Sequence, residues 1–164
     1  MRRFQSLLLS FFVVMLAGCG FQLRGEVKLS GALSPMFVTG VNTRETLYAE
    51  IQRNLNAGGV LITEDPARAR SWLKISGSDF RQNVLSVDAR GKVVEYELAQ
   101  TLAFSVLDRR RKPIVPQATL VARRSFVNPE TTVLGKSSER DRLRDAMQRE
   151  LVRKLMARLR ARAR

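Results

Sequence analysis

The stretch VEYELAQTLAFSV, residues 94–106, alternates between apolar and polar side chains and decides the fold of this chain. Large apolar residues stand at the even positions, where Gln100 is the one polar exception, and small or polar residues fill the odd positions. A period of two indicates a β-strand, because successive side chains point to opposite faces of the sheet. We therefore predict a long strand with one face packed on a core and the other exposed to water or covered by a partner.

Turn signals on both sides of this strand place it in an antiparallel series. The turn at 88–91 links it to an apolar run at 84–87, and the basic turn at 109–113 leads to a strand at 118–126. A further strand is predicted at 72–80. Because short turns join neighbouring strands in antiparallel pairs, these segments predict a largely antiparallel sheet.

A first helix is predicted over residues 43–56, where apolar residues recur at helical spacing until a pair of glycines ends the pattern. Asn42 and Glu45 form a capping-box pattern at its start. A short apolar run at 36–39 precedes the helix and is predicted to be a strand. Residues 60–63 follow it and indicate a short strand or a strand-like edge.

A second, longer helix is predicted at the C-terminus, with Ser138 and Asp141 as its cap. Its apolar residues recur every three or four positions, while most other positions are Arg or Lys and indicate a solvated face. The apolar positions are Leu143, Ala146, Met147, Leu151, Leu155 and Leu159. The predicted fold is of the α+β class, a two-layer sandwich with two helices on one face of a mixed, mostly antiparallel sheet of about four strands.

The N-terminus has the pattern of a cleaved targeting segment. Two arginines precede an uncharged apolar run at 7–16, which is shorter than the roughly 20 residues of a membrane-spanning helix. The sequence LAGC, residues 16–19, follows this run and resembles a bacterial lipobox, with Cys19 as the acceptor of a diacylglycerol. We therefore predict a lipoprotein signal peptide over residues 1–18.

The remainder, residues 19–164, is the size of one domain and is predicted to form a single periplasmic unit anchored through lipid on Cys19. Two or more acyl chains anchor a protein stably where a single chain is marginal. Gly20 follows the cysteine, in place of the Asp typical of lipoproteins retained in the inner membrane, so we expect the protein in the outer membrane.

The chain is strongly basic, with 29 Lys and Arg against 15 Asp and Glu and a net charge of +14. In a cytosolic protein this charge would indicate nucleic acid as the partner, but export excludes it. The polyanions available in the periplasm are lipid A phosphates and the acidic walls of partner proteins. We therefore expect a binding role and no nucleic-acid partner.

Catalytic chemistry has little support in the sequence. The chain has no histidine, and its one cysteine is the predicted lipid acceptor, so Ser-His pairs, Cys nucleophiles and the usual zinc shells are excluded. Glu95 and Glu97 share one strand face and could imitate the carboxylate pair of a glycosidase. A solvated or partner-facing strand surface explains them as well. We expect a binding or scaffold protein that needs no cofactor and no metal.

Three cations are candidates for contact with an anionic ligand. Arg90 and Lys92 flank Gly91 at a predicted hairpin tip, and Lys136 is predicted to lie in the loop before the last helix. Cations on loops can reach a phosphate without disturbing the core. They are the predicted ligand-binding residues.

The sequence resembles the lipopolysaccharide-assembly lipoprotein family LptE. Three stretches carry the resemblance, and they are distributed over nearly the whole mature chain. They are CGFQLRG at 19–25, SVDARGKVVEYEL at 86–98 and RSFVNP at 124–129, the last followed by the basic helix.

The resemblance implies a two-layer α/β domain that plugs the lumen of the large β-barrel LptD, assists the assembly of that barrel and contacts lipopolysaccharide on its way to the outer leaflet. It places lipopolysaccharide near Arg90, Lys92 and Lys136. The alternative that remains is a lipoprotein adaptor of another outer-membrane assembly or secretion complex, which would share the anchor and the lack of catalytic residues.

Overall fold

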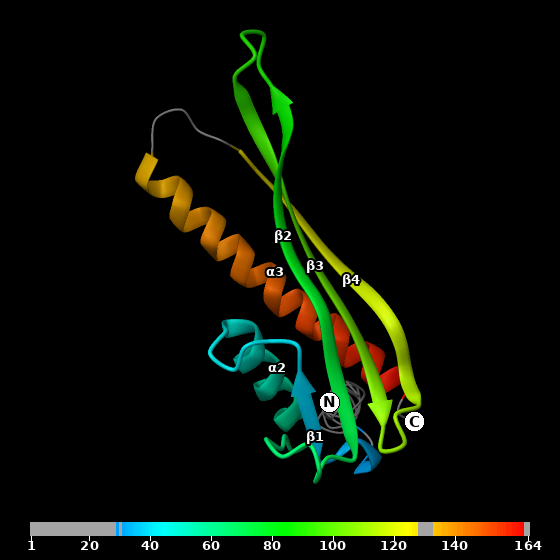
Figure 1. Cartoon of the computed structure of the whole chain (residues 1–164). Coiled ribbons are helices and arrows are strands. Elements are labelled where there is room, and N and C mark those ends of the chain that lie inside the picture. Colours follow the sequence, from blue (N-terminus) through cyan, green and yellow to red (C-terminus); the bar gives the residue numbers. More distant parts are fainter. Residues whose placement is uncertain (1–28, 30, 128–132, 163–164) are drawn as a thin grey trace, which may run out of the picture.

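The computed structural model describes residue 29, residues 31–127 and residues 133–162 (Figure 1). A short 3-10 turn, η1 (Gly31–Leu33), leads into the first strand, and the described elements continue in the order strand, helix, three strands, helix. Their bounds are β1 (Met36–Thr39), α2 (Thr46–Ala57), β2 (Ser71–Val87), β3 (Val93–Asp108), β4 (Pro113–Val127) and α3 (Val133–Arg162).

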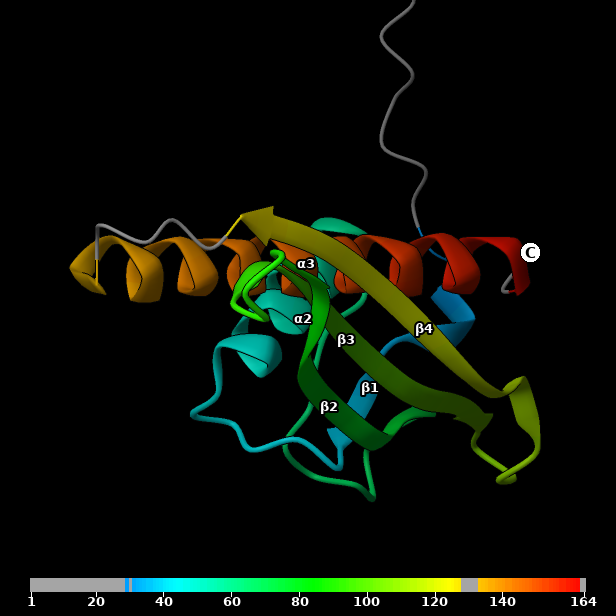
Figure 2. The ribbon, with the colours of Figure 1, turned by 90° about the horizontal axis from the view of Figure 1, so that it is seen from above.

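The four strands form one sheet in the order β1-β2-β3-β4. The short strand β1 pairs with the start of β2 in parallel, and the remaining pairs are antiparallel. Both described helices, α2 and α3, lie on the same face of this sheet, and we call the opposite face, which neither of them covers, the helix-free face (Figures 1 and 2). The predicted fold class, two helices on a mixed and mostly antiparallel sheet of four strands, is confirmed.

Strand β3 provides the centre of the core. Leu98, Leu102, Phe104 and Val106 are fully buried against the helices, as the alternation predicted. Gln100, the polar exception, also faces the core and is buried, and its side-chain carbonyl oxygen has no hydrogen-bond partner among the described residues. The odd residues of β3 are half-buried and lie on the face that neither α2 nor α3 covers.

Strand β2 differs from the prediction of two separate strands. The segments predicted at 72–80 and 84–87 belong to one strand of 17 residues that pairs with β3 along its length. Irregularities between Ile75 and Gly77 and between Val84 and Ser86 shift the register. The sequence pattern divided the strand at residues 81–83, where the register is regular, because Arg81, Gln82 and Asn83 are all polar and exposed and show no apolar alternation.

The first helix begins later than predicted, and its predicted cap is wrong. Glu45 is the N-cap residue of α2 and makes no side-chain capping bond. The side-chain oxygen of Asn42 instead accepts a hydrogen bond from the backbone N–H of Arg44, at 3.0 Å. Asn side chains readily bond to the backbone two residues on, so a turn takes the place of the predicted capping box.

The last helix begins earlier than predicted. α3 starts at Val133, so Ser138 and Asp141 lie within the helix and the predicted cap there is wrong. Lys136 also lies within α3 and not in a loop, which corrects its predicted location. Gly135 lies in the first turn of the helix, and a single glycine costs a helix only about 1 kcal/mol, too little to end it.

The backbone also tests the predictions for the two short apolar segments beside the first helix. The predicted strand at 36–39 is confirmed as β1, and residues 60–63 form a strand-like edge with one isolated bridge, between Met36 and Ile62. Among the helices of the described ranges, none combines the length and the apolar character that crossing a membrane requires.

Candidate functional site

The β2–β3 turn projects from the end of the sheet that is far from β1 (Figure 1). One oxygen of the Asp88 carboxylate accepts hydrogen bonds from the backbone N–H groups of Arg90 and Lys92, both at 2.9 Å. Gly91 takes a positive φ of 76°, which glycine adopts without steric cost, and the turn closes from Asp88 N–H to Lys92 O at 2.8 Å. This geometry is a three-residue hairpin turn with the glycine that it requires.

The second oxygen of Asp88 binds the Arg90 side chain. The Nε and Nη2 atoms of Arg90 lie 3.2 and 3.0 Å from it. The hydrogen bond from the Lys92 backbone, together with those from Arg90, holds the pKa of Asp88 below its usual value. Residues 88–92 therefore carry a net single positive charge at neutral pH, with the Arg90 guanidinium exposed but oriented by Asp88.

The β3–β4 turn, at the opposite end of the sheet, repeats this arrangement. Asp108 accepts from the backbone N–H groups of Arg110 and Lys112, both at 2.8 Å. Arg111, not a glycine, takes the positive φ here, at 63°, and its guanidinium stacks over the Trp72 ring at 4.1 Å. The strain of a left-handed arginine is offset by this contact with the tryptophan on the helix-free face.

The structure places two of the three predicted ligand-binding cations together. Arg90 and Lys92 lie on the β2–β3 turn as predicted, while Lys136 is on a separate element, the N-terminal part of α3. The turn and that part of α3 lie toward the same end of the sheet (Figure 1). Cys19, the predicted lipid acceptor, lies outside the described residues.

The helix-free face of the sheet, formed on β3 by the odd-numbered side chains, is the second candidate surface. Thr101 and Ser105 are half-buried on it. Glu97 is also half-buried there, and its carboxylate lies 3.9 Å from the Arg123 guanidinium of β4. At these positions the surface is thus polar and partly charge-paired.

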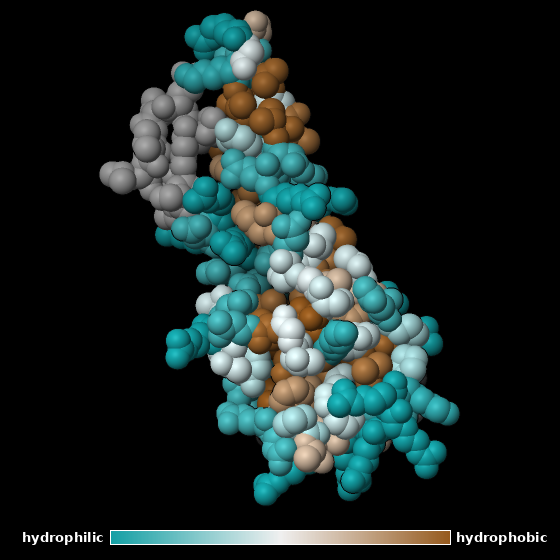
Figure 3. Space-filling model, viewed as in Figure 1, coloured by the Kyte–Doolittle hydropathy of each residue, from teal (hydrophilic) through white to brown (hydrophobic). Residues whose placement is uncertain are grey.

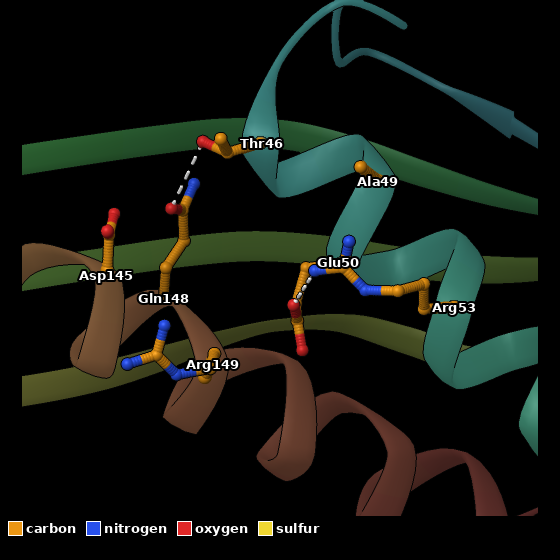
Figure 4. A pocket seen from close by; sticks show the side chains of 7 residues that line it. All are labelled: Thr46, Ala49, Glu50, Arg53, Asp145, Gln148 and Arg149. Carbon is orange, nitrogen blue, oxygen red and sulfur yellow. Dashed lines mark hydrogen bonds and ion pairs between the residues drawn. The ribbon is translucent and has the colours of Figure 1, made fainter.

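The Glu95 and Glu97 pair gains no support as a glycosidase site. A cavity of about 230 Å³ lies instead between α2 and α3, on the other face of the sheet (Figure 4). Thr46 donates a hydrogen bond to the Gln148 side chain across it, at 3.4 Å, and Glu50 pairs with Arg53 of its own helix. Partial burial works against ionisation of Glu50, but the hydrogen bonds from Arg53 and Asn54 outweigh it and lower the pKa.

Glu50 is therefore charge-paired within α2, and the hydrogen bond between Thr46 and Gln148 joins α2 to α3, which is the arrangement of a structural contact. Within the described ranges, no group of three His, Cys, Asp or Glu side chains is placed to hold a metal ion.

A polar contact that the sequence did not indicate connects α3 to β4. Glu150 binds Arg124 of β4 and Lys154 of its own helix, the latter at 2.8 Å. Lys154 also donates to the backbone oxygen of Val121, at 2.7 Å, and so covers an acceptor on the sheet edge. The hydrogen bonds from Lys154 and Arg124 lower the pKa of Glu150. Only the tertiary structure brings these residues together, since the two elements are separated in sequence.

Known proteins resemble this chain over most of its length. The family described as LptE, Lipopolysaccharide-assembly, matches residues 33–159. The LPS-assembly lipoprotein LptE of Yersinia enterocolitica is 33% identical over 159 residues, covering 94% of this chain and 76% of the relative. The protein of the same name from Pectobacterium atrosepticum is 30% identical and covers 94% of this chain and 85% of the relative.

Solved structures share the fold. The solution structure of an uncharacterized lipoprotein B from Nitrosomonas europaea superposes with a TM-score of 0.70 at 22% identity, covering 86% of this chain and 88% of that one. The crystal structure of rare lipoprotein B from Shewanella oneidensis gives 0.66 at 19% identity, covering 76% and 92%.

Proposed function

The chain belongs to the LptE family of lipopolysaccharide-assembly proteins, and we propose that it is the lipoprotein subunit that works with the barrel LptD to place lipopolysaccharide in the outer leaflet of the outer membrane. The observation that carries the proposal is the family match over residues 33–159, which includes every strand and nearly all of both helices. The protein acts by binding, as a barrel plug and assembly aid, and not by catalysis.

The helix-free face of the sheet supports a protein partner. A sheet face without a covering layer is normally solvated or docked, and this one carries polar residues of the kind that line the lumen of large barrels. We propose that Thr101 and Ser105 lie in the contact with LptD, with the domain inside the barrel or at its periplasmic mouth.

We also propose that residues 1–18 are removed and that lipid on Cys19 attaches the domain, residues 19–164, to the outer membrane. The lipobox pattern supports this step, and the names of the relatives, which call them lipoproteins, agree with it.

Co-purification tests the partnership directly. Full-length protein isolated from its own envelope in mild detergent is expected to retain one large β-barrel protein in stoichiometric amount. Thr101→Glu is expected to reduce the retained barrel severalfold, because it places an extra carboxylate in the proposed contact. Gln52→Glu, which adds the same charge on the exposed side of α2, is the matched control and is expected to retain the barrel.

Recovery of a secretion complex in place of a barrel would support the adaptor alternative. If Thr101→Glu unfolds the isolated domain, the helix-free face belongs to the core and is not a docking surface.

Lipopolysaccharide is the proposed ligand of Arg90, Lys92 and Lys136. Reversing Arg90 and Lys136 together to Glu is expected to weaken lipopolysaccharide binding about tenfold or more at matched salt, because charge-assisted contacts to phosphate are stronger than neutral ones. Surface plasmon resonance on purified protein measures the change. Stability is expected to stay within about 0.5 kcal/mol of the parent, the usual range for substitutions that leave the core unchanged.

The structure also provides controls for this double reversal. Because Arg90 is paired with Asp88, reversal places two carboxylates at the tip, so the neutral Arg90→Gln with Lys136→Gln separates loss of a cation from repulsion. Arg109→Glu with Arg110→Glu makes the same charge change on exposed residues of the opposite turn. Equal weakening by both pairs of reversals would show a general charge effect and contradict the assignment.

A further inference from the structure

Large aliphatic side chains are exposed at the distal end of the sheet, beside the β2–β3 turn. Six large hydrophobic side chains among the described residues are strongly exposed. Leu61 lies elsewhere, and the other five lie at this end of the sheet with 41% to 64% of their surface exposed. The five form what we call the distal apolar patch, which consists of Val84, Leu85, Val87, Val94 and Val127. Figure 3 shows hydrophobic surface gathered just below the tip of the hairpin.

The distal apolar patch extends around the strands instead of occupying one side. Val84 pairs with Tyr96, an even position of β3, and therefore shares the face on which the helices lie. Val127 pairs with Glu95, an odd position, and therefore lies on the helix-free face. Tyr96 stacks on Phe126 at 5.5 Å between ring centroids and continues the apolar surface from the patch toward the core.

This distribution distinguishes between two kinds of occupant. A protein interface is usually rich in aromatic residues and Arg, and the lumen of a large barrel, which would surround this end of the sheet, is polar. The distal apolar patch consists of Val and Leu alone and presents them on opposite faces of a narrow set of strands. Flexible hydrocarbon chains can surround such a structure, and an exposed apolar surface of this kind normally has a ligand or interface.

The positive charge beside the patch is complementary to the headgroup of an anionic amphiphile. The turn at 88–92 lies in the sequence between the patch residues of β2 and Val94 of β3, and it carries a net positive charge. A ligand with phosphates attached to several acyl chains would thus meet cations at the tip and aliphatic side chains just below it.

We propose that the distal apolar patch binds the acyl chains of lipopolysaccharide, a site additional to the cations at the tip. The inference rests on the proposed function for the identity of the glycolipid. Replacing the aliphatic side chains of the patch with polar ones should therefore weaken the binding of acylated lipopolysaccharide. The binding of lipopolysaccharide without acyl chains should stay the same.

The test compares full-length proteins in mild detergent and measures binding to three probes. These are intact lipopolysaccharide, the same material chemically stripped of its acyl chains, and mixed micelles of phosphatidylethanolamine and phosphatidylglycerol in the same detergent that contain no lipopolysaccharide. Val84→Ser with Val127→Ser changes one aliphatic residue on each face of the patch. Leu61→Ser, at a position 68% exposed and outside the patch, is the matched control.

The double variant is expected to bind intact lipopolysaccharide at least tenfold more weakly than the parent and to bind the deacylated form equally, while Leu61→Ser leaves both affinities unchanged. Thermal unfolding of the three proteins checks that the fold is retained. Equal binding of intact lipopolysaccharide by parent and double variant overturns the proposal, and so does an equally large loss of binding to the phospholipid micelles in the double variant.

Loss of the barrel from the double variant, with lipopolysaccharide binding unchanged, also overturns it and assigns the patch to the protein partner. In each of these results the parent still binds lipopolysaccharide or the barrel, so the proposed function stands. If the parent binds neither form of lipopolysaccharide and retains no barrel, the proposed function itself has failed.

Discussion

Phe104→Ala is expected to lower the free energy of unfolding by about 3–5 kcal/mol, because removing a buried phenyl ring loses its transfer free energy and leaves a cavity. Phe104 is fully buried at the centre of β3, where its strand neighbours are Ile75 and Ala118. Domains of this size have a total stability of about 5–15 kcal/mol, so the change removes a large part of it. Urea denaturation followed by the fluorescence of Trp72, the one tryptophan of the chain, measures the effect.

The residue next to Phe104 provides the control. Ser105 lies on the helix-free face and is half-buried, so Ser105→Ala is expected to change stability by no more than about 0.5 kcal/mol. A similar loss of stability in both variants would mean that the two faces of β3 are equally packed, in conflict with the two-layer arrangement.

Cys19→Ala is expected to abolish lipid attachment, because no other thiol exists in the chain to accept the diacylglycerol. Because stable anchoring needs two or more acyl chains, the variant should lose its direct attachment to the membrane, so that whatever stays in the outer-membrane fraction is held by the barrel alone. Mass spectrometry of the mature N-terminus and fractionation of the envelope measure the two effects.

The anchor and the fold should be separable. The purified Cys19→Ala protein is expected to unfold at the same urea concentration as the parent, because acyl chains add attachment to the membrane and no area to the core. An unmodified N-terminus in the parent protein would contradict the lipid anchor, whatever the variant does.

The local structure of the β2–β3 turn could be predicted from the sequence only in part. The turn at 88–91 was predicted from Asp88 and Gly91, and the structure uses both, the carboxylate for the backbone N–H groups and the glycine for the positive φ. The pairing of Arg90 with the second oxygen of Asp88 was not predicted. It depends on the side-chain conformation within the finished turn, which residue order alone does not specify.

The sequence by itself determined the faces of β3, the presence and type of both helices and the fold class, because periodicity reports directly on which side chains share a surface. The starts of the helices were not readable: α3 begins at Val133, before the predicted cap, and the Asn42 side chain accepts from the N–H of Arg44 in place of the N–H of Glu45 that a capping box requires. Local alternatives of similar energy decide such boundaries.

Only the tertiary structure decided which apolar segments are covered. The run at 84–87 has the composition of a buried strand, yet Val84, Leu85 and Val87 are exposed, because β2 and β3 extend past the region where the helices lie against the sheet. The contact of Glu150 with Arg124 likewise exists only because α3 crosses β4. Burial depends on what another element places over a surface, and that information is distributed over the whole chain instead of residing in the segment itself.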